Sequence, residues 1–316
     1  MRTGLILGAL VLLAAGALAV ALMAGSAGLP DLSSEAGRRI LFELRLPRAI
    51  AALVTGSLLA LAGAVMQVLL RNPLADPYIL GLSGGAGAFA LAGIGLGLAF
   101  VPVELLAFAG AMVSMLIVFV LGRGSGPWST TRMLLTGVVV AAGWGAVITL
   151  MLALGSDASL RGMLYWLMGD LSYARLSPWW LLAPVALTGL LMLRARSMNV
   201  LVSGQVQAAL LGEAPRARLV ELYVAASLLT GLAVAIAGPV GFVGLIVPHL
   251  VRLAIGADHR RLLPAAALFG GAFLLLADTL ARSVLAPRQL PVGVVTALIG
   301  VPLFLMLLHR TGGRQR

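Results

Sequence analysis

The chain has 316 residues, of which 61% are hydrophobic and only 10% are charged. A soluble domain is closer to half apolar and a quarter charged, so the composition excludes an ordinary soluble protein and indicates a membrane protein. The formal net charge is +11, and all 22 basic residues are arginines lying between apolar runs, which favours membrane topology over nucleic-acid binding as its explanation. Cysteine and lysine are absent, which excludes disulfides, thiolate metal sites, a lysine Schiff base and the P-loop of an ATPase.

Ten apolar stretches predict an all-α polytopic membrane protein with a single transmembrane domain over residues 1–316. The first stretch is longer than the apolar core of a signal peptide, so an uncleaved helix is favoured, although segment 24–27 loosely resembles a cleavage site. In chain order the expected spans are residues 4–25, 49–70, 79–100, 102–121, 132–154, 177–193, 219–237, 239–255, 265–285 and 291–308.

The polar segments between these spans have different characters. Segment 29–44 allows a short surface helix, and the two prolines of segment 71–77 break the chain firmly. Segment 155–176 is a longer connector, in which Tyr165 and Trp166 are expected to anchor at the membrane interface. Segment 194–218 is the most polar interior stretch and predicts short amphipathic pieces rather than a span.

An even number of spans places both termini on one side of the membrane, and the arginine distribution predicts which side. With the amino terminus inside, all but eight of the 22 arginines fall in inner segments, so the positive-inside rule favours cytoplasmic termini. The eight outer arginines run against the rule and need another explanation. They are Arg38, Arg39, Arg45, Arg48, Arg161, Arg175, Arg282 and Arg288.

Three Gly- and Pro-rich apolar stretches carry the functional argument: residues 45–50 (RLPRAI), 71–88 (RNPLADPYILGLSGGAGA) and 238–252 (GPVGFVGLIVPHLVR). In a close-packed membrane bundle, glycine lets helix backbones approach and neighbouring helices satisfy the backbone groups that proline frees. Gly56 and Gly63 in the second span are further expected points of close approach. Other motifs include Gln67, YWLMG at 165–169, DHR at 258–260, AD…AR across 277–282, and the run 290–308.

Taken in order and spacing, these motifs make nearly the whole chain resemble the FecCD-type permeases, the membrane subunits of type II ABC importers for iron–siderophore complexes, heme and cobalamin. The resemblance implies a BtuC-like bundle in the bacterial cytoplasmic (inner) membrane. It also implies a homodimer with two cytoplasmic ATP-binding subunits and a periplasmic or lipoprotein substrate-binding protein. The chain itself would be no enzyme and bind no cofactor, because ATP and Mg²⁺ would be used by the partner. Ferric siderophore is the expected cargo, and heme or cobalamin is the alternative.

The first site that the resemblance implies is the docking surface for the binding protein. Arg45, Arg48 and Arg282 occupy positions where the family places arginines that meet acidic residues of the binding protein, and arginine pairs with carboxylates in an oriented, bidentate way. The alternative is local neutralisation, because Asp278 precedes Arg282 by four residues and Glu43 is near Arg45. No role is assigned to Arg288.

The second site is the surface that couples to the ATPase. Segment 205–219 matches the place of short cytoplasmic helices in the family, with a glycine for the turn between them. An ordinary solvated loop is the alternative, but its apolar residues need a surface to bury against. The residues assigned to coupling are Gln205, Val206, Leu210, Leu211, Gly212 and Glu213.

The third site is the translocation path, which the resemblance places along the fifth and tenth spans with the connector after the fifth as a gate. The candidate lining residues are Thr136, Trp144, Thr149 and Ser156, although packing stays the favoured interpretation for each one alone. Mostly apolar, small walls suit a conduit that does not hold its cargo.

Other polar residues do not predict metal or catalytic chemistry. The chain has three histidines, and neither His249 nor His259 has the i, i+4 partner of a helical metal site, so His249 is expected to be a capping or interfacial group. Asp278 is ionisable near a span, but pairing with Arg282 is the favoured explanation. The rival class is an ATP-independent secondary transporter, which usually shows charged residues at midspan, and none is convincing here.

Overall fold

The structure is a computed structural model that describes residues 2–25, 28, 31–98, 100–123 and 129–312, and the regular elements in these residues are all helices. Of segment 24–27, which loosely resembles a signal-peptide cleavage site, Ser26 and Ala27 lie outside the described residues. The helices are α1 (Arg2–Met23), α2 (Glu35–Arg39), the π-helix η1 (Ile40–Arg45), α3 (Leu46–Leu69), the 3₁₀ helix η2 (Pro77–Leu80), α4 (Leu82–Gly95), α5 (Val103–Arg123), α6 (Thr130–Leu154), α7 (Asp157–Leu167), η3 (Pro178–Leu181), α8 (Leu182–Met192), α9 (Ala195–Leu201), α10 (Gln205–Leu210), α11 (Pro215–Ala237), α12 (Val243–Ile255), α13 (His259–Ser283) and α14 (Val292–Gly312).

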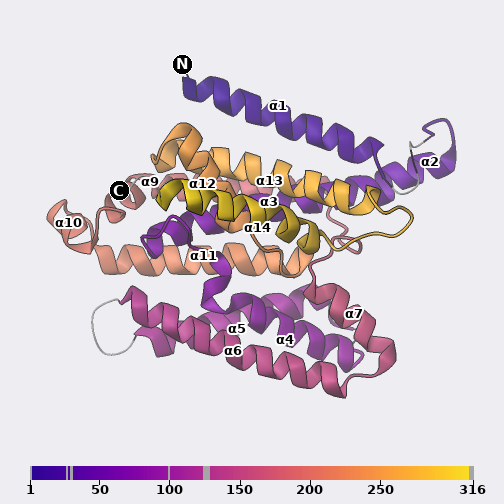
Figure 1. Cartoon of the computed structure of the whole chain (residues 1–316), viewed down its shortest axis with the longest axis horizontal. Coiled ribbons are helices and arrows are strands. Elements are labelled where there is room, and N and C mark those ends of the chain that lie inside the picture. Colours follow the sequence, from indigo (N-terminus) through magenta and orange to yellow (C-terminus); the bar gives the residue numbers. More distant parts are fainter. Residues whose placement is uncertain (1, 26–27, 29–30, 99, 124–128, 313–316) are drawn as a thin grey trace.

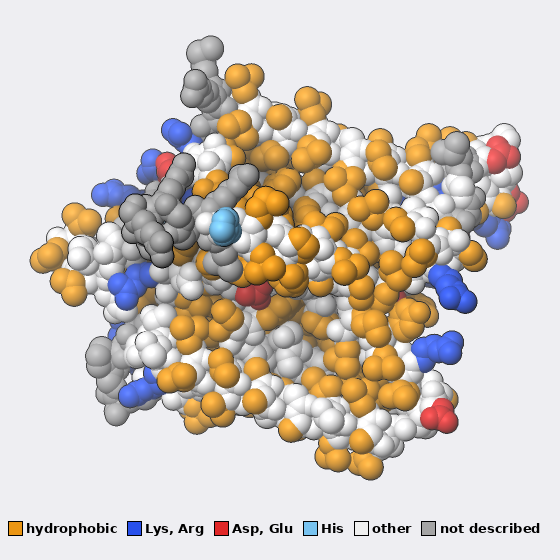
Figure 2. All heavy atoms as spheres, viewed as in Figure 1, with side chains coloured by type: hydrophobic (Ala, Val, Ile, Leu, Met, Phe, Trp, Pro, Cys, Tyr) orange, Lys and Arg blue, Asp and Glu red, His pale blue; other side chains and the backbone are white. Residues whose placement is uncertain are grey.

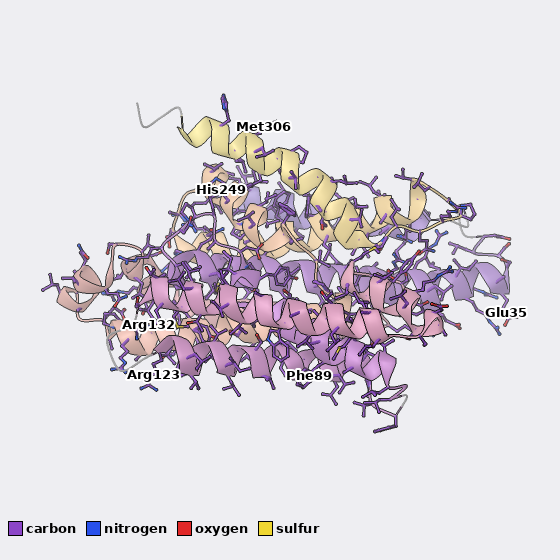
Figure 3. The ribbon with its side chains drawn as sticks, turned by 60° about the horizontal axis from the view of Figure 1, so that its bottom comes forward. Glu35, Phe89, Arg123, Arg132, His249 and Met306 are labelled. Carbon is purple, nitrogen blue, oxygen red and sulfur yellow. The ribbon has the colours of Figure 1, made fainter. Side chains whose placement is uncertain are left out.

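The long helices run side by side along the longest axis of the molecule (Figure 1). Both ends of the chain lie at the end that carries α9 and α10, whereas α2 and α7 lie at the opposite end. Arg123 and Arg132 share the end with α10, and Glu35 marks the other (Figure 3). After the predicted topology, we call the end with the termini the inner end and the opposite one the outer end.

Helix α3 is the axis of the bundle. In the most apolar 18-residue stretch of the continuous segment Glu35–Leu69, 94% of the residues are buried. Helices α11, α12 and α13 all pack against α3. Glycines make these contacts close: a Cβ on Gly56 would collide with the carbonyl oxygen of Gly270 in α13, and one on Gly63 with that of Gly244 in α12. The prediction that Gly56 and Gly63 are points of close approach is therefore confirmed, as expected of helices that associate by packing within lipid.

The expected spans correspond to helices of three kinds among the described residues. Six helices are long and apolar enough to cross a membrane, and η3–α8 with α9 forms a further pair bent by 58°. Three expected spans, 79–100, 239–255 and 291–308, correspond to shorter apolar helices, because α4, α12 and α14 have apolar stretches of only 10–17 residues. Segment 29–44 differs most from expectation: α2 and η1 run without interruption into α3 instead of forming a separate surface helix.

The two shortest of these helices begin at breaks in the chain that face each other. The Asp76 carboxylate caps η2 by accepting from the Tyr78 backbone N–H at 2.7 Å, and Gly81 turns the chain into α4 with φ +71°. The Tyr78 hydroxyl in turn accepts from the backbone N–H of Val240, at 3.0 Å, in the break between α11 and α12. Each break therefore satisfies a backbone group that proline or glycine has left outside a helix.

The surface of the molecule between its two ends is largely hydrophobic, and charged side chains gather mainly at the ends (Figure 2). Large apolar side chains such as Leu12 in α1, Val139 in α6 and Leu298 in α14 are 74%, 70% and 68% exposed. Such an apolar band of exposed side chains suits lipid or another protein and not water.

We predict that Gly63→Ala destabilises the chain by about 1–3 kcal/mol, because the new methyl group forces α3 and α12 apart. Denaturant titration of the purified protein in detergent micelles measures the change. Gly16→Ala in α1 is the matched control, because a Cβ there meets nothing within 4 Å, and it should leave stability unchanged or raise it slightly. Equal stability of the two variants would contradict the packing assigned to Gly63.

Candidate functional site

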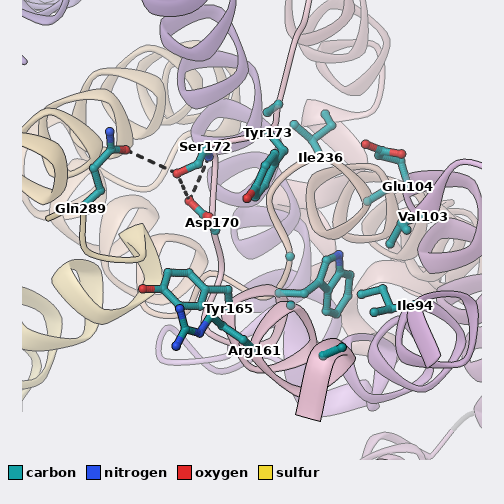
Figure 4. A pocket seen from close by; sticks show the side chains of 16 residues that line it. Ile94, Val103, Glu104, Arg161, Tyr165, Asp170, Ser172, Tyr173, Ile236 and Gln289 are labelled. Carbon is teal, nitrogen blue, oxygen red and sulfur yellow. Dashed lines mark hydrogen bonds between the residues drawn. The ribbon is translucent and has the colours of Figure 1, made fainter. Parts of the chain in front are cut away.

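A cavity of about 820 Å³ opens at the outer end of the bundle, and we call it the outer cavity (Figure 4). Its wall comes from α4, α5, α7, the end of α11, the connector after α7 and the loop before α14. The wall combines aromatic rings with several polar side chains. The side chains that give it this character are Tyr165, Trp166 and Tyr173, together with Glu104, Arg161, Asp170, Ser172 and Gln289.

The connector after α7, residues 168–177, is fastened to its neighbours through the backbone. Gly169 has φ +74°, a conformation that favours glycine, and its carbonyl accepts from the Gly293 N–H at 3.3 Å. The next N–H, of Asp170, donates to the carbonyl of Ala237 at 2.9 Å. The connector thus joins the end of α11 to the start of α14, while the Asp170 carboxylate accepts from the backbone and hydroxyl of Ser172.

Behind this wall lies an ion pair between α3 and α13. Arg48 Nη2 is 2.8 Å from Asp278 Oδ1, and Arg48 Nε lies 3.0–3.1 Å from both carboxylate oxygens. The remaining nitrogen, Arg48 Nη1, donates to Gln289 Oε1 at 2.7 Å and to Ser172 Oγ at 3.2 Å. Both charged residues are buried, with 8% of Arg48 and 0% of Asp278 exposed.

The other two arginines assigned to docking hold the end of α1. Arg45 Nη1 donates to the carbonyls of Leu22 and Met23 at 2.9 and 2.7 Å, and Arg282 Nη2 donates to that of Ala21. These are carbonyls that the end of a helix leaves without internal partners, at the negative end of its dipole. Both arginines are only 5% exposed.

The structure therefore places Arg45, Arg48 and Arg282 together at the outer end, but each is buried and occupied within the chain. Local neutralisation takes a different form from the one expected. The closest partner of Asp278 is Arg48, whereas Arg282 Nε is 3.7 Å away, and Arg45 bonds to backbone carbonyls where Glu43 was the expected partner. Arg288 is exposed in the loop before α14.

At the inner end, α9 and α10 form the short helical pieces expected for segment 194–218. Gly212 has φ +82°, so the glycine at the expected turn does adopt a left-handed conformation. Val206, Leu210 and Leu211 are 70%, 83% and 69% exposed and form an apolar surface on and after α10. Gln205 begins this helix, and the Glu213 carboxylate accepts from Ser197 Oγ at 2.8 Å, which fixes the turn against α9.

The two buried histidines lie at the inner end. His249 is 6% exposed and lies inside α12, so it does not cap the end of that helix. His259 begins α13, where Asn199 Oδ1 accepts from its backbone N–H at 2.9 Å. Asn199 also donates to the Asp258 carboxylate at 2.8 Å, and this bond, with one from the Arg260 backbone, lowers the pKa of Asp258. The described residues contain no group of three or more His, Asp or Glu placed to hold a metal ion.

The four candidate lining residues of the path do not share one environment. Thr149 in α6 and Ser156 before α7 are exposed, and Thr136 is half-buried. Trp144 instead packs toward α4 and α5: its indole N–H donates to Ser114 Oγ at 3.1 Å, and its ring meets Phe89 edge-on with centroids 6.2 Å apart. Its packing role is thus visible in the structure.

Sequence reasoning missed Ser172 and Gln289, the two neutral side chains that connect Arg48 to the cavity wall. The Asp-x-Ser spacing of Asp170 and Ser172 is a turn signal, so it carried some information about local geometry. Nothing in the sequence marks Gln289, because its partner Arg48 lies 241 positions away.

Comparisons with known proteins agree along the chain. Residues 4–310 match the FecCD transport family. The chain is 45% identical to a cobalamin import system permease, BtuC, of Halobacterium salinarum, over 87% of this chain and 74% of that protein. It is 41% identical to a hemin transport system permease, HmuU, of Yersinia pestis, over 88% and 85%. It is also 41% identical to an uncharacterized ABC transporter permease, YvrB, of Bacillus subtilis, over 87% and 81%.

A solved structure described as an inward-facing conformation of a putative metal-chelate type ABC transporter superposes with a TM-score of 0.84. That superposition covers 97% of this chain and 99% of the other, at 29% sequence identity. The PsaBC structure from Streptococcus pneumoniae aligns with a TM-score of 0.58 at 14% identity and shows likeness of fold alone.

We predict that Asp278→Ala costs about 3–5 kcal/mol of stability, because it leaves the buried Arg48 and Arg282 cations without their carboxylate. Glu35→Ala is the control at the same end of the bundle. It breaks the exposed Arg39–Glu35 pair, whose side chains are 66% and 74% exposed, and should cost less than about 1 kcal/mol. Denaturant titration in detergent compares the two variants, and similar costs would show that the Asp278 pair does not behave as a buried one.

Proposed function

The chain belongs to the FecCD transport family and is a permease of a type II ABC importer, and from this we propose that it forms the path by which a metal chelate enters a bacterial cell. The observation that carries the proposal is the match to the family over residues 4–310. The expected alternative, an ATP-independent secondary transporter, is a different class from this family. We propose that a partner ATPase hydrolyses ATP with Mg²⁺, and that this chain itself catalyses no reaction and binds no cofactor.

We propose that all ten apolar segments cross the bacterial cytoplasmic membrane and that both termini are cytoplasmic. Six long helices, one bent pair and three shorter apolar helices supply the ten segments among the described residues. The shorter ones lie against α3 or other long helices, which suits discontinuous helices inside a protein-lined interior. The inner end, with both termini and α10, is then the cytoplasmic end.

We propose that the apolar surface of α10 is where the cytoplasmic ATP-binding subunit docks, one to each permease. Leu210 and Leu211 are exposed in a polar segment between two expected spans, and exposed apolar side chains of this kind suit a protein partner better than water. Gln205, Gly212 and Glu213 shape the helix and its turn, so their role is to present the leucines. Two permeases with two ATPases make the proposed membrane assembly.

We propose that the substrate-binding protein docks at the outer end, where its acidic residues would pair with Arg45, Arg48 and Arg282. Because these guanidiniums are buried, an incoming carboxylate would act on an arginine cluster that already has internal partners. The outer end also presents Arg288, which is exposed and carries charge of the same sign. Charge complementarity of this kind fixes register and speeds encounter.

The path is proposed to run between two copies of the chain, along the exposed faces of α6 and α14. Only 6% of the most apolar 18-residue stretch of α6 is buried in the single chain. Thr149 is one of the exposed residues of this helix. Helix α7, which follows Ser156 and borders the outer cavity, is the proposed gate. Thr136 stays a candidate lining residue, while the contacts of Trp144 with α4 and α5 favour packing.

The cargo proposal is a metal chelate, for which the sequence favoured a ferric siderophore. The named relatives include permeases for cobalamin and for hemin, both tetrapyrrole-type metal complexes, and this supports the alternative cargo class. An apolar conduit that carries such bulky complexes needs width more than specific contacts. Selection among cargoes is then the task of the binding protein.

We predict ATP-dependent uptake in proteoliposomes that hold this chain with its ATPase and binding protein. Ferric siderophore, hemin and cobalamin are compared with and without internal ATP, and one of them should accumulate only with ATP. Liposomes with the permease but without the ATPase are the control. Uptake of the same cargo in that control, or without ATP, would overturn the importer proposal and support a secondary transporter.

We also predict that Leu210→Asp weakens binding of the ATPase subunit at least tenfold, about 1.4 kcal/mol, because a charge replaces the exposed apolar contact. Co-purification at graded concentrations measures the binding. Gln207→Glu is the matched control, since it changes an exposed polar residue of the same helix and should keep the ATPase bound. Undiminished binding by the Leu210 variant would place the coupling surface elsewhere.

A further inference from the structure

The guanidinium of Arg48 is a junction between the rigid interior and two connecting segments. Its Nε and Nη2 atoms donate to Asp278 in α13, which packs against α3 along its length. Its Nη1 atom donates outward, to Ser172 in the connector after α7 and to Gln289 in the loop before α14. The cation thus reaches three residues, each more than a hundred positions away from Arg48 in the sequence.

The two outward partners lie in the wall of the outer cavity. Ser172 and Gln289 both line it, and their side-chain oxygens are 3.5 Å apart on the same side (Figure 4). Ser172 is also bonded to Asp170, whose backbone N–H is held by the end of α11. A single guanidinium therefore ties together the segment that follows α7 and the segment that begins α14.

Asp278 is what makes this orientation of Arg48 stable. It holds the guanidinium by a forked pair of hydrogen bonds, a geometry that fixes the plane of an arginine more firmly than a single contact does. It is fully buried and also faces Arg282 at 3.7 Å, so it is the carboxylate placed between two cations. With the fork in place, Nη1 can point only toward the cavity wall.

We propose that Asp278 is a positioning residue of the permease: through Arg48 it sets Ser172 and Gln289, and so holds the connector after α7 and the loop before α14 in register at the outer cavity. The proposal rests on the proposed function, in which α14 borders the path and α7 is its gate. The buried Arg48–Asp278 pair would then set how the two segments lie at the outer cavity without itself touching the cargo. An acidic partner that drew Arg48 away from Asp278 would release both segments at once.

The test uses the full-length chain in lipid nanodiscs and exploits the absence of native cysteine. Ala158→Cys in α7 and Arg288→Cys in the loop before α14, both exposed positions, take spin labels. Labelled protein is diluted with unlabelled chain, so that pulsed electron paramagnetic resonance reports the distance distribution between the two labels of one protomer. The distribution is measured in the parent, in Asp278→Asn, and in Ser172→Ala combined with Gln289→Ala.

We expect both altered proteins to give a distribution at least twice as broad as that of the parent. The double variant leaves the Arg48–Asp278 pair intact, so it decides the question if Asp278→Asn fails to fold. Gln289→Glu in the Ser172→Ala background keeps an acceptor for Arg48 Nη1 and should restore the narrow distribution. Glu35→Gln, which alters an exposed pair at the same end, should change nothing.

An unchanged distribution in the folded double variant would overturn the proposal, as would broadening that Gln289→Glu does not reverse. Because the distance measurement needs neither ATPase nor cargo, it is independent of whether the importer proposal holds. A second readout connects the two: in the assembled transporter, the double variant should lose at least half of the stimulation of ATP hydrolysis by the binding protein while keeping its thermal midpoint. A variant with full stimulation would show that the register of these segments does not matter for transport.

Discussion

Backbone-to-backbone contact along α3 is the constraint on which the bundle depends. Lipid offers helices no hydrophobic reason to associate, so the fold needs surfaces that fit closely enough for dispersion and short polar contacts to hold them. Gly56 and Gly63 lie on one face of α3, about two turns apart, and provide such surfaces toward α13 and α12 respectively. With these contacts fixed, the position of Asp278 in α13 relative to Arg48 in α3 is fixed as well, and the polar junction follows from the packing.

The buried arginines, aspartate and histidines lie near the two ends of the bundle. At the outer end Arg48 and Arg282 face the buried Asp278 carboxylate, while Arg45 and Arg282 donate to carbonyls at the end of α1. At the inner end Asn199 connects α9 to the turn before α13 through Asp258 and His259. Between them the contacts are mainly apolar, which is what a bilayer requires of a spanning bundle. The outer cavity and the surface of α10 therefore stand at opposite ends of the same rigid core.

The sequence predicted the parts of this molecule that depend on local pattern. Apolar stretches located the helices, glycine spacing located the close approaches on α3, and exposed leucines in a polar segment located α10. The sequence did not predict which residues far apart in the chain would contact each other. Asp278 has an arginine four positions away, yet its nearer partner is Arg48, 230 positions earlier, because helix packing and not sequence distance decides the pair. Tertiary packing likewise turned Trp144 toward Ser114 and Phe89.

The hydrogen bond between Arg282 and the end of α1 has a consequence for how the protein is made. Its two partners are 261 residues apart, so Ala21 leaves the ribosome long before Arg282 is synthesised. Helix α1 has few neighbours even in the finished bundle, because only 11% of its most apolar 18-residue stretch is buried, and it packs mainly against α13. Arg45 can bond the end of α1 early in synthesis, but the main packing partner of α1 is α13, so the first helix gains most of its contacts only when this late helix is complete.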